Sequence, residues 1–154
     1  MLINFEKNMQ LALLQAQKAL ALGEVPIGAI ITDETGAVIG AGYNQIEINQ
    51  TQTAHAEILA LMQAAKKKGD WRLQNCTLYS TLEPCAMCMS AIVLSRVSCV
   101  VFAAASPIFG YRVDKQIGFT LYNCPIKIHE GILASDAKAL LQIFFEGCRR
   151  SNGD

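Results

Sequence analysis

The sequence has no excess of either charge, because 13 lysines and arginines balance 13 aspartates and glutamates. Attraction of the whole protein to nucleic acid through its bulk charge is therefore excluded, and any basic surface must be local. The candidates are Lys66, Lys67 and Lys68, and the pair Arg149 and Arg150. Short charge runs at helix ends are more often simply solvated.

Long apolar runs, low-complexity tracts and internal repeats are also missing. The sequence has no stretch of about twenty apolar residues, which is the length that spans a membrane. The first ten residues also lack the basic start and apolar run of a secretory signal. We therefore expect a cytoplasmic protein with no membrane contact. With 154 residues, 52% of them apolar, we expect a single globular domain over residues 1–154. In a reducing compartment, the six cysteines are better interpreted as metal ligands or catalytic groups than as a disulfide framework.

Apolar periodicity predicts alternating helices and strands. Helices are expected over residues 5–22, 54–68, 84–94 and 134–150, and strands over 25–32, 37–41, 76–81, 97–103 and 125–129, with loops at 44–52 and 106–119. Thr53 is expected to cap the second helix, and Pro84 to lie in the first turn of the third. This order predicts a three-layer α/β/α fold with a mixed sheet of about five strands, an early antiparallel hairpin, and helices on both faces.

Two predicted helices begin with residues that bind metals. Cys85 and Cys88 are three apart, so both sulfurs face one side of a helix start, where unpaired N–H groups favour the thiolate. A lone Cys-x-x-Cys is equally typical of a redox motif or of two buried residues. His55, one of only two histidines, begins another helix thirty residues upstream and supplies a third ligand.

Three protein ligands favour a catalytic zinc site, because structural sites usually close with four. Glu57 lies two residues after His55 and is the candidate proton carrier, although a glutamate in a first turn is often only a helix-dipole partner. The joint pattern, His55-Ala56-Glu57 followed by Pro84-Cys85-Ala86-Met87-Cys88, is the signature of zinc-dependent nucleobase deaminases.

Several further segments carry a family resemblance over nearly the whole chain: residues 23–29 (GEVPIGA), 42–44 (GYN), 53–57 (TAHAE), 77–85 (TLYSTLEPC) and 130–134 (EGILA), and Phe144-Phe145 with Arg149-Arg150. On these segments the sequence resembles the bacterial tRNA-specific adenosine deaminases, within the cytidine deaminase-like superfamily. The resemblance implies that zinc activates a water, that Glu57 transfers protons, and that adenosine at the wobble position of a tRNA anticodon arm becomes inosine with release of ammonia. It also implies a homodimer with one zinc ion per subunit.

The resemblance further implies that Asn44, Val25, Pro26, Ala56 and Phe145 bind the substrate, and that the two terminal arginines contact RNA. The residue pattern alone also allows Asn44 to be a turn residue and Phe145 a core aromatic.

One segment departs from the family pattern. Residues 104–112 read AASPIFGYR, where the family usually carries an acidic-basic loop rich in glycine and alanine, and Thr51-Gln52 is a milder departure. The changed loop keeps open a deaminase of a free base or nucleoside, of guanine or cytosine type. A remote alternative is a structural zinc module, which needs a fourth ligand. The available residues are Cys76, Cys99, Cys124, Cys148 and His129, most of which resemble ordinary buried or surface residues.

Overall fold

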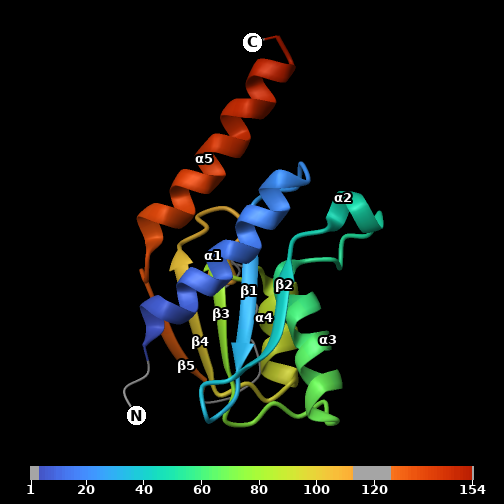
Figure 1. Cartoon of the computed structure of the whole chain (residues 1–154), viewed down its shortest axis with the longest axis vertical. Coiled ribbons are helices and arrows are strands. Elements are labelled where there is room, and N and C mark those ends of the chain that lie inside the picture. Colours follow the sequence, from blue (N-terminus) through green and yellow to red (C-terminus); the bar gives the residue numbers. More distant parts are fainter. Residues whose placement is uncertain (1–3, 113–125, 154) are drawn as a thin grey trace.

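The computed structural model describes residues 4–112 and 126–153, and its helices and strands alternate along the chain (Figure 1). The elements are α1 (Phe5–Ala21), β1 (Gly28–Thr32), β2 (Val38–Tyr43), α2 (Ile46–Asn49), α3 (Ala56–Lys68), β3 (Thr77–Leu82), α4 (Ala86–Leu94), β4 (Cys99–Ala104), β5 (Lys127–Glu130) and α5 (Ala134–Ser151). Within the described residues, no helix is both long and apolar enough to cross a membrane.

The five strands form one mixed sheet in the order β2-β1-β3-β4-β5. β1 pairs antiparallel with both β2 and β3, whereas β3, β4 and β5 run parallel to one another. The carboxyl ends of β2, β3 and β4 therefore meet at one edge of the sheet, which is where ligands usually bind in α/β folds. The mixed five-stranded sheet and the early antiparallel hairpin confirm the fold predicted from periodicity.

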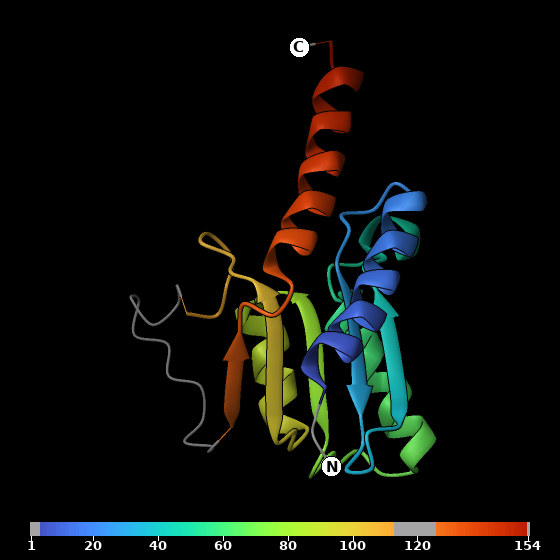
Figure 2. The same cartoon turned by 60° about the vertical axis from the view of Figure 1, so that its left-hand side comes forward.

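Helices cover both faces of the sheet. α1 and the first turns of α5 pack on one face, and α3 and α4 pack on the other (Figure 2). Successive residues of β1 alternate between the two cores, with Ile30 facing α1 and both Ala29 and Ile31 facing α3. Beyond its first turns, α5 projects away from the sheet, and Ala137 is its only buried residue.

Small residues set the position of α3. Gly40 and Gly42 of β2 face Ala56 and Ala60 so closely that a Cβ on either glycine would overlap the α3 backbone or side chains. Removing those side chains lets the first turn of α3 lie directly against the strand. This close contact fixes where the residues at the start of α3 are placed.

Three local predictions were wrong or incomplete. The N-cap of α3 is His55 and not Thr53, whose hydroxyl lies 3.1 Å from the Thr51 hydroxyl instead. Pro84 precedes the Cys85 N-cap of α4, so it lies just outside the helix and not in its first turn. The loop predicted over residues 44–52 contains α2, a single helical turn whose four residues are too few to produce a periodic signal.

Candidate active site

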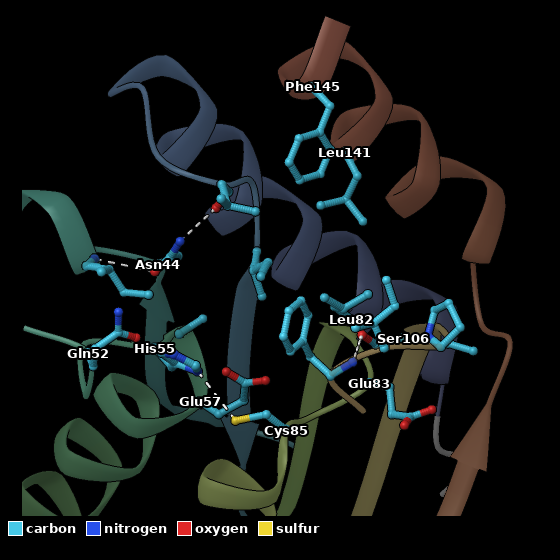
Figure 3. A pocket seen from close by; sticks show the side chains of 18 residues that line it. Asn44, Gln52, His55, Glu57, Leu82, Glu83, Cys85, Ser106, Leu141 and Phe145 are labelled. Carbon is cyan, nitrogen blue, oxygen red and sulfur yellow. Dashed lines mark hydrogen bonds between the residues drawn. The ribbon is translucent and has the colours of Figure 1, made fainter. Parts of the chain in front are cut away.

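The starts of α3 and α4 bring three metal-ligand side chains together. His55 and Cys85 are the N-cap residues of these helices, and neither side chain caps its own helix. His55 Nδ1 lies 3.7 Å from Cys85 Sγ and 3.4 Å from Cys88 Sγ. Figure 3 shows His55 and Cys85 pointing toward one another below α5. The ring nitrogen nearest both sulfurs is therefore Nδ1.

These distances fit the donor set of a zinc ion. Zn–S bonds of about 2.3 Å and Zn–N bonds of about 2.0 Å place sulfur and nitrogen about 3.6 Å apart in a tetrahedral site. The three ligand atoms all lie within 4.8 Å of one another. One imidazole and two sulfurs could thus hold a tetrahedral ion and leave one coordination position for another group.

The two cysteines have opposite pKa shifts. The adjacent Cys88 side chain, followed by the hydrogen bond with His55, lowers the pKa of Cys85 to about 4. The adjacent Cys85 side chain and burial both raise the pKa of the Cys88 thiol. The bond to Cys85 also raises the pKa of His55. Cys85 is therefore the cysteine that forms the thiolate more readily, and the thiolate is the form that binds metal.

Glu57 lies beside this group and is only 4% exposed. Its Oε1 accepts a 3.1 Å hydrogen bond from the Ser80 hydroxyl, and its Oε2 accepts one of 3.6 Å from Cys88. Burial raises the pKa of the Glu57 carboxyl, so the protein makes protonation of this group easier than it is in water. A carboxyl with that property, next to a metal-ligand group, is suited to proton transfer.

A fourth protein ligand is not found among the described residues. Cys76 and Cys99 lie at the opposite end of β3 and β4, Cys148 is exposed on α5, and His129 on β5 packs its ring against Phe5 at 4.8 Å. None of these four joins the group of three ligands. Cys124, the remaining candidate, lies outside the described residues. Within the described part, the donor set is that of a catalytic site.

A cavity of about 550 Å³ opens above Glu57 and the metal-ligand group. Its wall includes predicted substrate-binding residues, namely Val25, Asn44, Ala56 and Phe145. Pro26 is buried and does not line the cavity. The rest of the wall is largely apolar. It comes from the residue before β1, from α2 and the segment after it, from the end of β3, from the loop after β4 and from α5: Ile27, Ile46, Gln52, Leu82, Glu83, Ala105, Ser106, Pro107, Ile108, Phe109 and Leu141.

Asn44 connects two parts of this wall. Its Nδ2 donates a 3.2 Å hydrogen bond to the Val25 carbonyl, and its Oδ1 accepts one of 3.4 Å from the Ile46 amide (Figure 3). An asparagine amide has two N–H donors and two acceptor lone pairs, so one donor and one acceptor remain for a ligand. The side chain thus has a structural role and retains groups that can bind a base.

Sequence reasoning did not identify the residues that hold the cavity walls in place. Glu24 is buried and accepts a 2.7 Å hydrogen bond from the Ile48 amide, which ties α2 to the wall. Glu83 is equally buried and receives two bonds from Arg112, which also contacts Glu130. These partners are far apart in sequence, and no short motif links them.

Comparisons with known proteins agree with this geometry. Residues 3–145 match the family described as MafB19-like deaminase. The chain is 42% identical to the tRNA-specific adenosine deaminase of Haemophilus influenzae, covering 92% of this chain and 83% of the relative. It is 40% identical to that of Bacillus subtilis, covering 94% and 91%. The chain belongs to the tRNA-specific adenosine deaminase family. This confirms the resemblance seen in the motifs, and the protein is an enzyme of the deaminase class.

Solved structures of this deaminase fold extend the comparison. A structure from studies of A-to-I editing by tRNA:A34 deaminases matches with a TM-score of 0.81 and 32% identity, covering 88% of this chain and 99% of that one. The guanine deaminase of Nitrosomonas europaea matches with a TM-score of 0.75 and 30% identity, covering 90% and 83%. The cytidine deaminase-like fold expected from the sequence is therefore confirmed, and the fold is shared by deaminases that differ in substrate.

Proposed function

We propose that this deaminase converts adenosine at the wobble position of a tRNA anticodon to inosine, with release of ammonia and with one zinc ion held by His55, Cys85 and Cys88. The observation that carries the proposal is the contact between these ligands and the buried Glu57 carboxyl at the floor of the cavity. The similarity to tRNA-specific adenosine deaminases over more than 90% of the chain supports the choice of substrate.

Zinc would supply Lewis-acid chemistry, because a bound water is acidified by many pKa units and becomes a nucleophile near neutral pH. The protein's own contribution is proton transfer and orientation. Glu57 accepts a proton from the attacking water and passes it to the ring nitrogen. It then takes the proton of the newly added hydroxyl and passes it to the amino group, so the C6–N bond breaks, ammonia leaves and the C6 carbonyl of inosine forms. The Ser80 hydroxyl holds Oε1 of Glu57 and thereby orients the carboxyl.

The wall of the cavity would position the base. The free donor and acceptor of Asn44 face a polar edge of the base, while Val25, Ala56 and Phe145 contact its apolar faces. Pro26 would act indirectly, since it follows Val25 in the chain but is buried and does not line the cavity. An anticodon loop presents bases that are already partly unstacked, so moving one base into this cavity is less costly than extracting it from a duplex.

The test is a deamination assay of the zinc-loaded protein on two classes of substrate. One class is a tRNA with adenosine at the wobble position, and the other comprises free adenine, guanine, cytosine and their nucleosides. We expect inosine in the tRNA and no ammonia from the free compounds. Ammonia released only from guanine would support the second candidate, which the structural similarity to guanine deaminase suggests. A Glu57→Gln variant measures the background in both assays.

We also propose that the protein forms a homodimer through α4. Met87 and Leu94 are exposed and seven residues apart, so they lie on one face of this short apolar helix with Ala91 between them. Light scattering should give the mass of two chains, and Leu94→Lys should give that of one chain. A monomeric wild type would contradict the proposal.

We further propose that one deaminase domain spans residues 1–154 and acts in the cytoplasm, where the proposed tRNA substrate is found.

A further inference from the structure

Two exposed aromatic side chains from different elements line the same cavity. Phe109, in the loop after β4, is 75% exposed, and Phe145 on α5 is 50% exposed. Ile108, next to Phe109, is 71% exposed and also lines the cavity. Exposed apolar residues are ordinary when they are scattered singly, whereas a group of them around one cavity is typical of a binding surface.

The cavity has more volume than the reacting base alone would fill. A volume of about 550 Å³ is in the range that holds a drug-sized ligand, whereas the reacting base has to reach only Glu57 and the metal-ligand group. In Figure 3, Phe145 and Leu141 point from α5 toward the region above His55 and Glu57. The upper part of the cavity is therefore available for groups next to the target base.

Among the described residues 105–112 of the loop that carries Phe109, no unpaired cation is present to hold a phosphate. Its arginine, Arg112, contacts Glu83 through Nε at 2.9 Å and through Nη2 at 2.5 Å, and contacts Glu130 through Nη1 at 2.5 Å. Among the described residues that line the cavity, none is a lysine or an arginine. Binding by these described residues must therefore depend on apolar and stacking contacts.

Further hydrogen bonds, besides those of Arg112, hold residues 106–112 in one position. The Tyr111 amide donates a 2.8 Å bond to the Pro84 carbonyl, and the Gly110 amide donates a 3.0 Å bond to the Ser106 carbonyl. The Phe109 amide lies 3.4 Å from the Ser106 hydroxyl, which accepts a bond from it. An aromatic side chain on a loop that is already ordered loses little conformational entropy when a ligand binds.

We propose that Phe109, which lines the same cavity as Phe145, is a substrate-binding residue that stacks on a nucleotide flanking the target adenosine. The proposal rests on the proposed function, since it requires an RNA substrate. Stacking on aromatic side chains is the usual way in which proteins hold unpaired bases, and it does not require a positively charged surface. The chain has no net charge, which agrees with binding of this kind.

The first experiment measures the kinetics of Phe109 variants on an RNA stem-loop with adenosine at the wobble position. We expect Phe109→Ala to raise KM about tenfold and to leave kcat within a factor of two of wild type, because a lost stacking contact weakens RNA binding and not the chemistry. Phe109→Trp should restore KM, and Phe109→Leu should not. Trp71→Ala removes another exposed aromatic side chain, on the segment after α3, and should leave both constants unchanged.

A second experiment detects stacking directly. In a Glu57→Gln background, which permits binding without turnover, a stem-loop with 2-aminopurine at each flanking position reports stacking by loss of fluorescence. We expect quenching at one flanking position with Phe109 present and its loss in Phe109→Ala.

The outcomes separate this inference from the proposed function. If wild type fails to deaminate the stem-loop, the proposed function and this inference both fall. If wild type is active and Phe109→Ala has an unchanged KM, or if Phe109→Leu matches wild type, only the stacking inference falls. Equal effects of Trp71→Ala and Phe109→Ala would also overturn it.

Discussion

The floor and the mouth of the cavity are built in opposite ways. At the floor, His55, Cys88 and Glu57 lie at the starts of two helices, and their contacts with one another and with Ser80 of β3 are polar and mostly buried. At the mouth, Phe109 and Phe145 are largely exposed and are carried by a loop and by a helix that projects from the sheet. Deamination requires the fixed geometry of the floor, whereas substrate choice can change with side chains at the mouth.

This difference explains how one fold serves several substrates. The chain shares its fold with a tRNA:A34 deaminase and with a guanine deaminase. Proteins with a common floor and different mouths would share zinc chemistry and differ in the molecules that reach it. Substitutions at the floor should therefore affect turnover of every substrate, and substitutions at the mouth should affect only substrates large enough to touch it.

The largest effect should follow from loss of a floor ligand. Cys88→Ser is expected to reduce zinc from one ion per chain to nearly none and to reduce activity to background. When free zinc is at about a thousand times its Kd, losing zinc binding lowers the free energy of unfolding by about 4 kcal/mol. Such a loss lowers Tm by roughly 10 °C. Metal analysis and thermal unfolding check this result. Cys148→Ser, at an exposed position on α5, should change neither quantity, and a zinc-loaded, active Cys88→Ser protein would exclude Cys88 as a ligand.

Removing the proton carrier should affect chemistry without loss of metal. Glu57→Gln keeps the shape and the Ser80 contact of the side chain but cannot accept the proton, so kcat should fall about a thousandfold while the zinc content stays at one ion. Single-turnover assays and metal analysis measure the two quantities. The control is Glu34→Gln, at an exposed position in the hairpin. A variant that retains wild-type kcat would rule out Glu57 as the proton carrier.

The floor could be predicted from sequence because its residues occur in two short segments. Each ligand lies within a few residues of a helix start, and helix starts can be inferred from apolar periodicity. The mouth could not be predicted in this way. The Glu83–Arg112 pair joins residues 29 positions apart, and the Glu24–Ile48 contact joins residues 24 apart. Such pairs arise from tertiary packing, and a single sequence carries no periodic signal for them.

The polar contacts behind the mouth should contribute moderately to stability and to RNA binding. Arg112→Met leaves the Glu83 carboxylate buried without its partner, so the free energy of unfolding should fall by about 2 kcal/mol. The loosened loop should also raise KM for the RNA stem-loop a few fold. Urea denaturation and steady-state kinetics measure the two effects. Arg72→Met, which breaks an exposed pair with Asp70, should have little effect on the free energy of unfolding. Equal losses in the two variants would show that the Glu83 pair has no special role.

The smallest effect should come from a cation beyond the mouth. Arg149 lies four residues after Phe145 on α5, so it is only about 40° from that side chain around the helix axis and could reach the RNA backbone. Arg149→Ala should weaken binding a few fold at low salt, with a smaller effect at high salt, and should reduce the slope of log K against log salt by about 1. Arg150 is about 140° from Phe145 around the same helix, so Arg150→Ala is the matched control. A salt titration of stem-loop binding by fluorescence anisotropy distinguishes the two variants. Equal losses would mean that the arginines act only through the net charge of α5, and the direction in which this helix faces would then have no influence on RNA binding.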